Sequence, residues 1–233
     1  GGSGADTVTL LNSSSGTIAL GDGANIVKIG DNVDISGATL SKSGSGTVAL
    51  NLSGSATSSV TVAAAHLKSV ANTVTEASSG AKTVTVVGAL TGTTISSTID
   101  TLVLADATNS VTLGAAAQNV TGGSGADTVT MINGASGTIA LAAGTNIVNV
   151  ADSVDITAAT ITAAGGTYDV NLTGTNASST MTSAQLKAAN SFTEGSSGTK
   201  QVTVTGALTG TTILSTIDTL VVANTTNDIT LVG

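Results

Sequence analysis

Apolar residues recur at every ninth position through a long stretch of the chain, each flanked by polar residues. From residue 95 to residue 130 this pattern divides into successive nine-residue segments, each with a polar turn ahead of its aliphatic position. The aliphatic residue stands eighth in its segment, as Leu102, Val111, Val120 and Val129. Alternation of this kind predicts short strands, each with one inward aliphatic side chain, joined by tight turns.

Two nine-residue segments together make a coil of about 18 residues, a length typical of stacked β-helical repeats. We therefore expect an all-β fold, a parallel β-solenoid built of half-coils of about nine residues. Such a thin core accepts only small or medium aliphatic side chains. Large rings do not fit it, which agrees with the presence of only two in the chain, Tyr168 and Phe192.

The sixth position of the same segments is an acid or an amide. The residues found there are Asp100, Asn109, Gln118 and Asp127, with Asn25, Asn146, Asp218 and Asn227 in the equivalent segments elsewhere. In-register stacking places like residues above one another, and ladders of amides or hydroxyls are tolerated there, whereas ladders of charge are not. The stacking explains why Thr and Asn are common and charged residues make up only 9% of the chain.

The chain is also a tandem duplication. Residues 1–40 match 122–161 without a gap at 26 identical positions, and residues 76–113 match 194–231 at 28. We expect two solenoid units, 1–121 and a truncated 122–233, and interpret the chain as a piece of a longer array. Residues 60–76 and 180–194 break the pattern and predict short helical insertions, the second capped by Thr182.

Composition narrows the classes of function. The formal net charge is −8 and all six basic residues are Lys, which excludes a nucleic-acid-binding face. The absence of Cys excludes disulfides, a thiol nucleophile and a Cys-type zinc site. No apolar run reaches the length of a membrane span.

Catalysis has little support. The single histidine, His66, is replaced by Gln185 in the second copy, so we interpret it as a surface residue on a helix. Ser residues have no base partner, and no cluster of acids and bases marks one face of the predicted solenoid. We expect no enzymatic activity.

The sequence GGSGADTVT occurs at 1–9 and again at 122–130, and it fits the nonapeptide G-G-x-G-x-D-x-U-x, in which U is aliphatic. On this motif the chain resembles RTX-type calcium-binding repeat proteins of the bacterial surface and, more broadly, S-layer proteins and large adhesins. The resemblance implies Ca²⁺ held in the turns by backbone carbonyls and the Asp at position six, with a partner turn one coil away. The implied ligands are Gly1, Gly2, Gly4 and Asp6, with Asp22 and Asn25 in the partner turn, and Gly122, Gly123, Gly125 and Asp127, with Asp106 and Asn109 in theirs.

A second interpretation of the same residues needs no metal, because Asp and Asn also cap turns by hydrogen bonding to nearby backbone groups. Each full motif stands alone among degenerate turns, and the turn at 141–146 has no acid. Thr-x-Thr triplets, such as Thr83 with Thr85, are typical of ice-binding solenoids, but neighbouring segments do not keep them.

These features predict a structural protein of the bacterial cell exterior, an S-layer, sheath or fibre repeat that assembles with copies of itself and is stabilised by Ca²⁺. The expected location is extracellular, and any contact with cell-surface polysaccharide would involve a segment outside this chain. The alternative is the extender stalk of an RTX-type adhesin. An ice-binding solenoid and the repeat region of an RTX hydrolase are less favoured.

Overall fold

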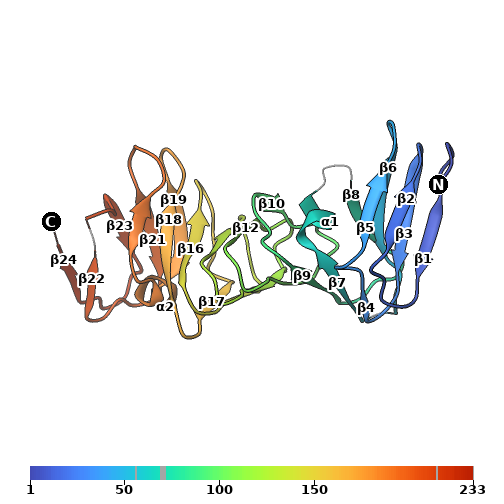
Figure 1. Ribbon diagram of the computed structural model, residues 1–233. Coiled ribbons are helices and arrows are strands. Elements are labelled where there is room, and N and C mark those ends of the chain that lie inside the picture. Colours follow the sequence, from blue (N-terminus) through green and yellow to red (C-terminus); the bar gives the residue numbers. More distant parts are fainter. Residues whose placement is uncertain (56, 69–71, 214, 233) are drawn as a thin grey trace.

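The computed structural model describes residues 1–55, 57–68, 72–213 and 215–232 as an elongated stack of short strands. The two ends of the chain lie at opposite ends of the stack (Figure 1). The strand pairs of the described residues are all parallel, and each strand pairs with a strand one coil before it, one coil after it, or both. This arrangement confirms the predicted all-β parallel solenoid.

Each coil returns to the same sheet one turn later, so the strand orders skip along the sequence. One sheet contains β1 (Thr7–Leu10), β3 (Ala24–Ile29), β6 (Thr47–Leu52) and β8 (Asn72–Glu76). A second contains β10 (Thr93–Thr94), β12 (Asn109–Thr112), β14 (Asp127–Thr130), β16 (Thr145–Val150), β18 (Thr167–Leu172) and β20 (Phe192–Glu194). The longest follows the order β17 (Thr160–Ala163), β15 (Thr138–Leu141), β13 (Asn119–Thr121), β11 (Thr101–Val103), β9 (Lys82–Val87), β7 (Ser58–Ala63) and β4 (Val33–Asp34). Smaller sheets join β2 (Thr17–Leu20) to β5 (Thr39–Lys42), β22 (Thr211–Ile213) to β24 (Ile229–Leu231), and β19 (Ser178–Thr182) to β21 (Gln201–Thr205) and β23 (Thr219–Val222).

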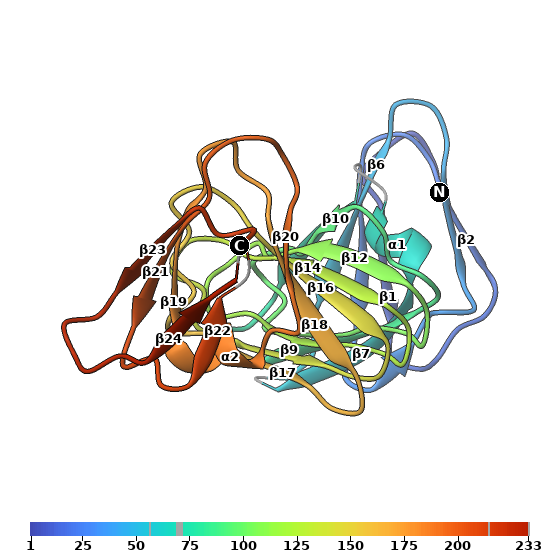
Figure 2. The same ribbon diagram turned by 90° about the vertical axis from the view of Figure 1, so that its left-hand side faces the viewer.

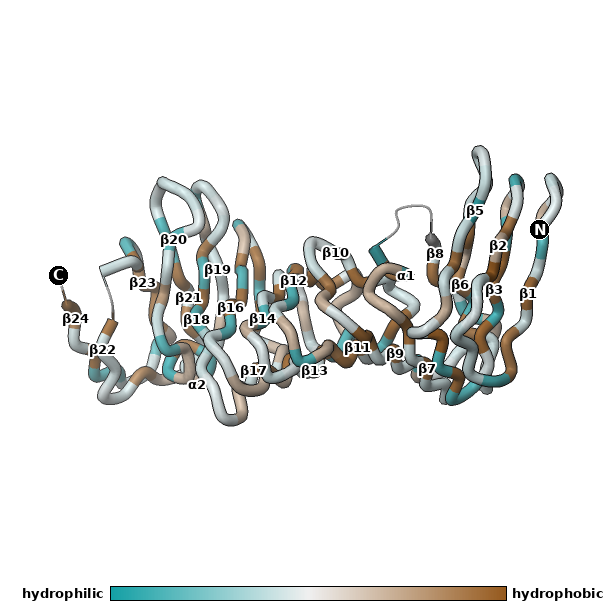
Figure 3. The backbone as a smooth tube through the Cα atoms, in the orientation of Figure 1, coloured by the Kyte–Doolittle hydropathy of each residue, from teal (hydrophilic) through white to brown (hydrophobic). Residues whose placement is uncertain are grey.

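Coil length varies along the stack. Leu102 pairs with Val84 and with Val120, which stand two nine-residue segments before and after it, and this confirms the predicted coil for this stretch. Nearer the N-terminus, Val27 pairs with Leu50, so the coil between them is longer than two such segments. The predicted length is too short there, because the extra residues form β4 and β5 on the way from β3 to β6. The stack is therefore narrow around β11 and β13 and wider on either side (Figures 1 and 3).

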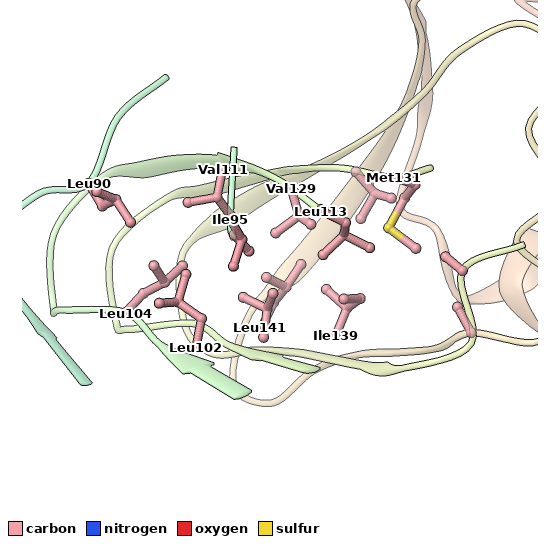
Figure 4. Packing of buried hydrophobic residues seen from close by; sticks show 14 of the residues in the cluster. Leu90, Ile95, Leu102, Leu104, Val111, Leu113, Val129, Met131, Ile139 and Leu141 are labelled. Carbon is pink, nitrogen blue, oxygen red and sulfur yellow. The ribbon is translucent and has the colours of Figure 1, made fainter. Parts of the chain in front are cut away.

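The core is a column of aliphatic side chains inside the coils (Figure 4). The residues at position eight are buried as predicted: Leu102, Val111, Val120 and Val129. The expectation of a single inward aliphatic per strand holds for these short strands and is wrong for longer ones, such as β6, which buries Val48, Leu50 and Leu52. Residues two apart on a strand share a face, and the residues that directly follow β11, β12 and β14, which are Leu104, Leu113 and Met131, are buried as well.

Both large rings belong to the core. Tyr168 is 2% exposed and Phe192 is 7% exposed, and both lie in coils longer than those around β11 and β13. The expectation that large rings do not fit therefore fails for the wide coils, whose extra length makes room. The Tyr168 hydroxyl donates to the Gln185 carbonyl oxygen at 3.1 Å, and burial raises the pKa of Tyr168 to about 12.

Each predicted helical insertion contains one short helix. α1 spans Ala64–Lys68 and α2 spans Ser183–Ala188, with strands on both sides of each. The helices are shorter than 60–76 and 180–194 suggested, and residues 69–71 of the first segment lie outside the described residues. Thr182 caps α2 as predicted, in a capping box with Gln185.

The predicted boundary between residues 121 and 122 lies between β13 and β14. Both long sheets continue across it, since β12 pairs with β14 and β13 with β15. Val120 and Val129, on either side of the boundary, are fully buried in the same core. Viewed along the stack, the first and last coils are displaced to opposite sides of the central ones, so the coils of this continuous column do not lie directly above one another (Figure 2).

Candidate functional site

The amide side chains at position six point into the turns and close them. The Asn109 Nδ2 donates to the carbonyl oxygens of Ala105 and Ala107, at 3.0 and 2.8 Å. Its Oδ1 accepts from the backbone N–H of Leu90, one coil earlier, at 2.9 Å. One buried side chain thus satisfies its own turn and joins it to the preceding coil.

The same arrangement recurs wherever Asn occupies position six. The Nδ2 atom donates to the carbonyls two and four residues before it at Asn25, Asn146 and Asn227. In each case the Oδ1 accepts from a backbone N–H one coil earlier: Asp6, Asp127 and Leu208. Gln118 also closes its turn, with the opposite polarity: its Oε1 accepts from two N–H groups of its own turn, and its Nε2 donates to two carbonyl oxygens one coil earlier. The turn-capping interpretation therefore holds for the amides.

Asp127 occupies the same position but lacks the amide hydrogens. It is fully buried, and its Oδ1 accepts from Asn109 Nδ2 at 2.7 Å, while its N–H donates to Asn146 Oδ1 at 2.9 Å. Its Oδ2 is buried and has no hydrogen-bond partner among the described residues. Burial raises the pKa of Asp127, an effect that Asn109 and the nearby N–H of Gly123 oppose and the negative charge of Asp106 reinforces.

Asp6, the equivalent residue of the first motif, is half-buried. Its Oδ2 accepts from the N–H of Gly2 at 3.1 Å, and its own N–H donates to Asn25 Oδ1 at 3.0 Å. The two motifs are identical in sequence, but only the second encloses its carboxylate between an earlier and a later coil. The two carboxylates therefore lie in different surroundings.

The predicted partner turns lie beside the motifs. Asn109 pairs directly with Asp127, and Asp106 Oδ1 accepts from the N–H of Ser124 at 2.7 Å. That backbone hydrogen bond lowers the pKa of the exposed Asp106. The structure thus brings Asp106, Asn109 and Asp127 together. In the first motif Asn25 contacts Asp6, whereas Asp22 bonds the N–H of Ser45, in the following coil.

Two predicted glycines allow the turns to stack closely. A Cβ on Gly123 or Gly125 would overlap the carbonyl oxygen of Ala105 or Ala107 in the turn before it. Gly122, like Gly1, lies against the Asp carboxylate of its own turn, whereas Gly2 and Gly4 have open space where a Cβ would be. The second motif therefore needs its glycines for packing between coils, with or without a metal.

Two fully buried lysines were not predicted from the sequence. Lys200 Nζ donates to the Gly174 carbonyl oxygen at 2.8 Å, and Lys82 Nζ donates to that of Ser55 at 3.0 Å. The N–H of each also donates to an Asp one coil later, Asp218 and Asp100, at 2.7 Å. A signal was present, because Lys82 at the start of β9 and Lys200 directly before β21 are in phase with the inward valines of those strands.

His66 is buried, so its interpretation as a surface residue is wrong. Its Nε2 lies 3.0 Å from the Ala38 carbonyl oxygen, and its Nδ1 accepts from the N–H of Ala63. Gln185 makes the equivalent pair of contacts in the second copy, donating to Ala159 O and accepting from Thr182 N–H. The exchange of His for Gln keeps a donor and an acceptor in place, which is a structural role.

Outward positions on the longest sheet form two rows of mainly hydroxyl side chains. One row runs Ser59, Thr83, Thr101, Asn119, Thr138, Thr160, and the other Thr61, Thr85, Val103, Thr121, Ala140, Thr162. Residues on this face of the longest sheet come from every second nine-residue segment, because neighbouring segments lie on opposite sides of the coil. Asn119, Val103 and Ala140 interrupt the Thr-x-Thr pattern.

Comparison with known proteins finds no match to this chain among family models, curated proteins or solved structures. No helix among the described residues is long and apolar enough to cross a membrane. In the same part of the chain no three His, Cys, Asp or Glu side chains gather as a metal-binding group. An ion held in the turns would depend on backbone oxygens beside one or two carboxylates.

Proposed function

We propose that this chain is a structural repeat of a bacterial cell-surface protein, of the S-layer, sheath or fibre kind, that assembles with copies of itself outside the cell. The observation that carries the proposal is the column of buried aliphatic side chains that crosses the junction of the two sequence repeats. Because each coil contacts mainly its neighbours, further repeats would lengthen the stack without any new kind of contact.

The side chains that point outward from the coils support contacts between copies of the chain. Charged residues make up 9% of the chain, and the outward rows are mainly Thr, Ser and Asn. Hydroxyl and amide groups can exchange water for hydrogen bonds to another surface at a smaller desolvation cost than charged groups. Such faces favour broad contact between rods.

Calcium enters this proposal at the Asp turns of the two full motifs. Asp127 fits a hard cation, because its buried Oδ2 has no hydrogen-bond partner among the described residues and Ca²⁺ prefers oxygen ligands. The Asp127 carboxylate would hold the ion together with Asp106 and the backbone oxygens of Gly122, Gly123 and Gly125. Bound calcium would neutralise the two acids and stabilise the folded coils by its binding free energy.

Negative-stain electron microscopy of the purified protein, in millimolar Ca²⁺ and again in chelator, tests the proposal. Sheets, tubes or fibres that form with calcium and dissolve in chelator would support it. Asp228→Asn is a matched control, since it removes one exposed carboxylate away from the motifs. Separate rods under both conditions would contradict calcium-driven assembly and favour the adhesin stalk.

A further inference from the structure

We propose that an Asn at position six closes its turn by itself, whereas the buried Asp127 turn requires a metal ion. Asp100 and Asp218 also stand at position six, but they are exposed, and each accepts a hydrogen bond from a backbone N–H one coil earlier. Asn turns are closed permanently by their own amide nitrogen, and the Asp127 turn is the one that responds to calcium. The part of this inference that concerns calcium at Asp127 rests on the proposed function. The part that concerns closure of the Asn turns rests on their hydrogen bonds alone.

In each buried Asn turn, oxygen atoms converge on the amide nitrogen. Asn25 Nδ2 lies 3.1, 3.1 and 3.2 Å from the carbonyl oxygens of Gly21, Gly23 and Thr47. Asn146 Nδ2 lies 3.2, 3.3 and 3.0 Å from those of Ala142, Gly144 and Thr167. Two acceptors come from the residue's own turn and one from the next coil. A partial positive charge built into the chain thus occupies the centre of an oxygen-rich turn.

Asn109 shows how this arrangement meets the Asp turn. Its Nδ2 has two carbonyl oxygens of its own turn as acceptors, and its third acceptor is Asp127 Oδ1 at 2.7 Å. The Asn109 turn therefore has its full set of three oxygens. Its amide also satisfies half of the Asp127 carboxylate from the preceding coil.

Asp127 reverses the chemistry of the position. An ionised carboxylate has no hydrogen to donate, so it cannot bond the carbonyl oxygens of Gly123 and Gly125, the counterparts of those that every Asn amide binds. Its Oδ2, in place of an amide nitrogen, is buried without a partner among the described residues. A buried carboxylate oxygen of this kind is costly unless a proton or a cation compensates it. The turn lacks one positive charge at the place where its neighbours carry an N–H group.

Asp6 differs because its surroundings already compensate it. Gly2 N–H donates to its Oδ2, and the side chain is half-exposed to water. The equivalent N–H of Gly123 lies near the Asp127 carboxylate and lowers its pKa, but it forms no hydrogen bond to the buried Oδ2. We therefore assign the calcium response of this chain to Asp127 rather than to both motifs equally.

The first test is Asp127→Asn, with thermal unfolding measured in chelator and in millimolar CaCl₂. The introduced amide can donate to the turn carbonyls as its neighbours do, so we expect the Tm in chelator to rise by about 2–4 °C. The Tm increase that calcium gives the unsubstituted chain should disappear. Asp228→Asn, which removes an exposed carboxylate, should leave both values unchanged.

The converse test is Asn146→Asp, which should lower the Tm in chelator and recover the loss when calcium is added. Isothermal titration should then detect one more Ca²⁺ than in the unsubstituted chain. Asn12→Asp, at an exposed position, serves as its control.

The outcomes separate the two proposals. A calcium-dependent Tm shift that persists in Asp127→Asn, or an Asp127→Asn chain no more stable in chelator than the original, would overturn this inference and leave calcium stabilisation standing. An unsubstituted chain whose Tm does not respond to calcium would overturn the proposed role of calcium, and with it the part of the inference that concerns calcium at Asp127.

Discussion

Gln118 offers the sharpest test of how the turns hold the solenoid together. Its side chain is 2% exposed and makes four hydrogen bonds to backbone groups. Oε1 accepts from Gly114 N at 2.6 Å and Ala115 N at 3.0 Å, and Nε2 donates to Ser96 O at 2.7 Å and Ile99 O at 2.8 Å. Gln118→Leu keeps the approximate volume and removes all of these bonds.

The expected cost follows from that count. Each lost hydrogen bond to a buried backbone group lowers the free energy of unfolding by about 1 kcal/mol, which gives about 4 kcal/mol for the set. Burial of an apolar side chain in place of the amide returns about 1 kcal/mol. We therefore expect Gln118→Leu to destabilise the protein by about 3 kcal/mol.

Urea unfolding followed by circular dichroism measures this difference, with Thr101→Val as a control on the outward face of β11. The control should remain within about 0.5 kcal/mol of the original chain. A loss below about 1 kcal/mol for Gln118→Leu would refute the reasoning, because it would mean that water replaces the amide without cost.

Further predictions concern three other buried polar residues. His66→Gln should stay within about 0.5 kcal/mol of the original stability because Gln185 already makes the same contacts, whereas His66→Leu should lose about 2 kcal/mol in urea unfolding. Since burial lowers the pKa of His66, its contribution to stability should fall as the pH drops below the unfolded value of 6.5, a slope that His66→Gln should remove in a pH series of melts. Lys200→Ala should cost at least about 2 kcal/mol, against almost nothing for the exposed Lys187→Ala; equal losses would show that burial of Lys200 is immaterial. In chelator, the deficit of the original chain relative to Asp127→Asn should shrink as the pH falls through the raised pKa of Asp127 towards 3.8, because protonation relieves the buried carboxylate; a pH-independent deficit would contradict this.

The nine-residue period can be read from the sequence because both half-coils of the narrow stretch have equal length. Position eight therefore always faces inward, as Leu102 and Val120 do. The period cannot be followed through the wide coils, since β4 and β5 add residues between β3 and β6. The inward positions there are no longer nine residues apart. A coil of two nine-residue segments is consequently right for the narrow stretch and again near the C-terminus, where Val202 pairs with Leu220, and wrong for the longer coils such as the one from Val27 to Leu50.

Position six could be identified as polar, but neither its burial nor its role could be read from residue type alone. Asp127 is buried there, whereas Asp100 and Asp218 are exposed. Asn109 and Asp127 are stacked partners that differ by one group, and whether that group donates or accepts depends on the oxygens around it. The buried lysines were missed for a related reason. Lys82 alternates with the inward Val84 and Val86 on β9, which indicates an inward position. Because lysine is rarely buried, its charge predicts the opposite.

The narrow stretch around β11 and β13 has a mechanical consequence. The bending stiffness of a beam falls steeply as its cross-section narrows, so a sideways load would concentrate its curvature in the short coils there. The wide coils would stay nearly rigid, and the narrow coils between them would act as a hinge. Under such a load the solenoid would bend at its narrow part while its wide parts keep their shape.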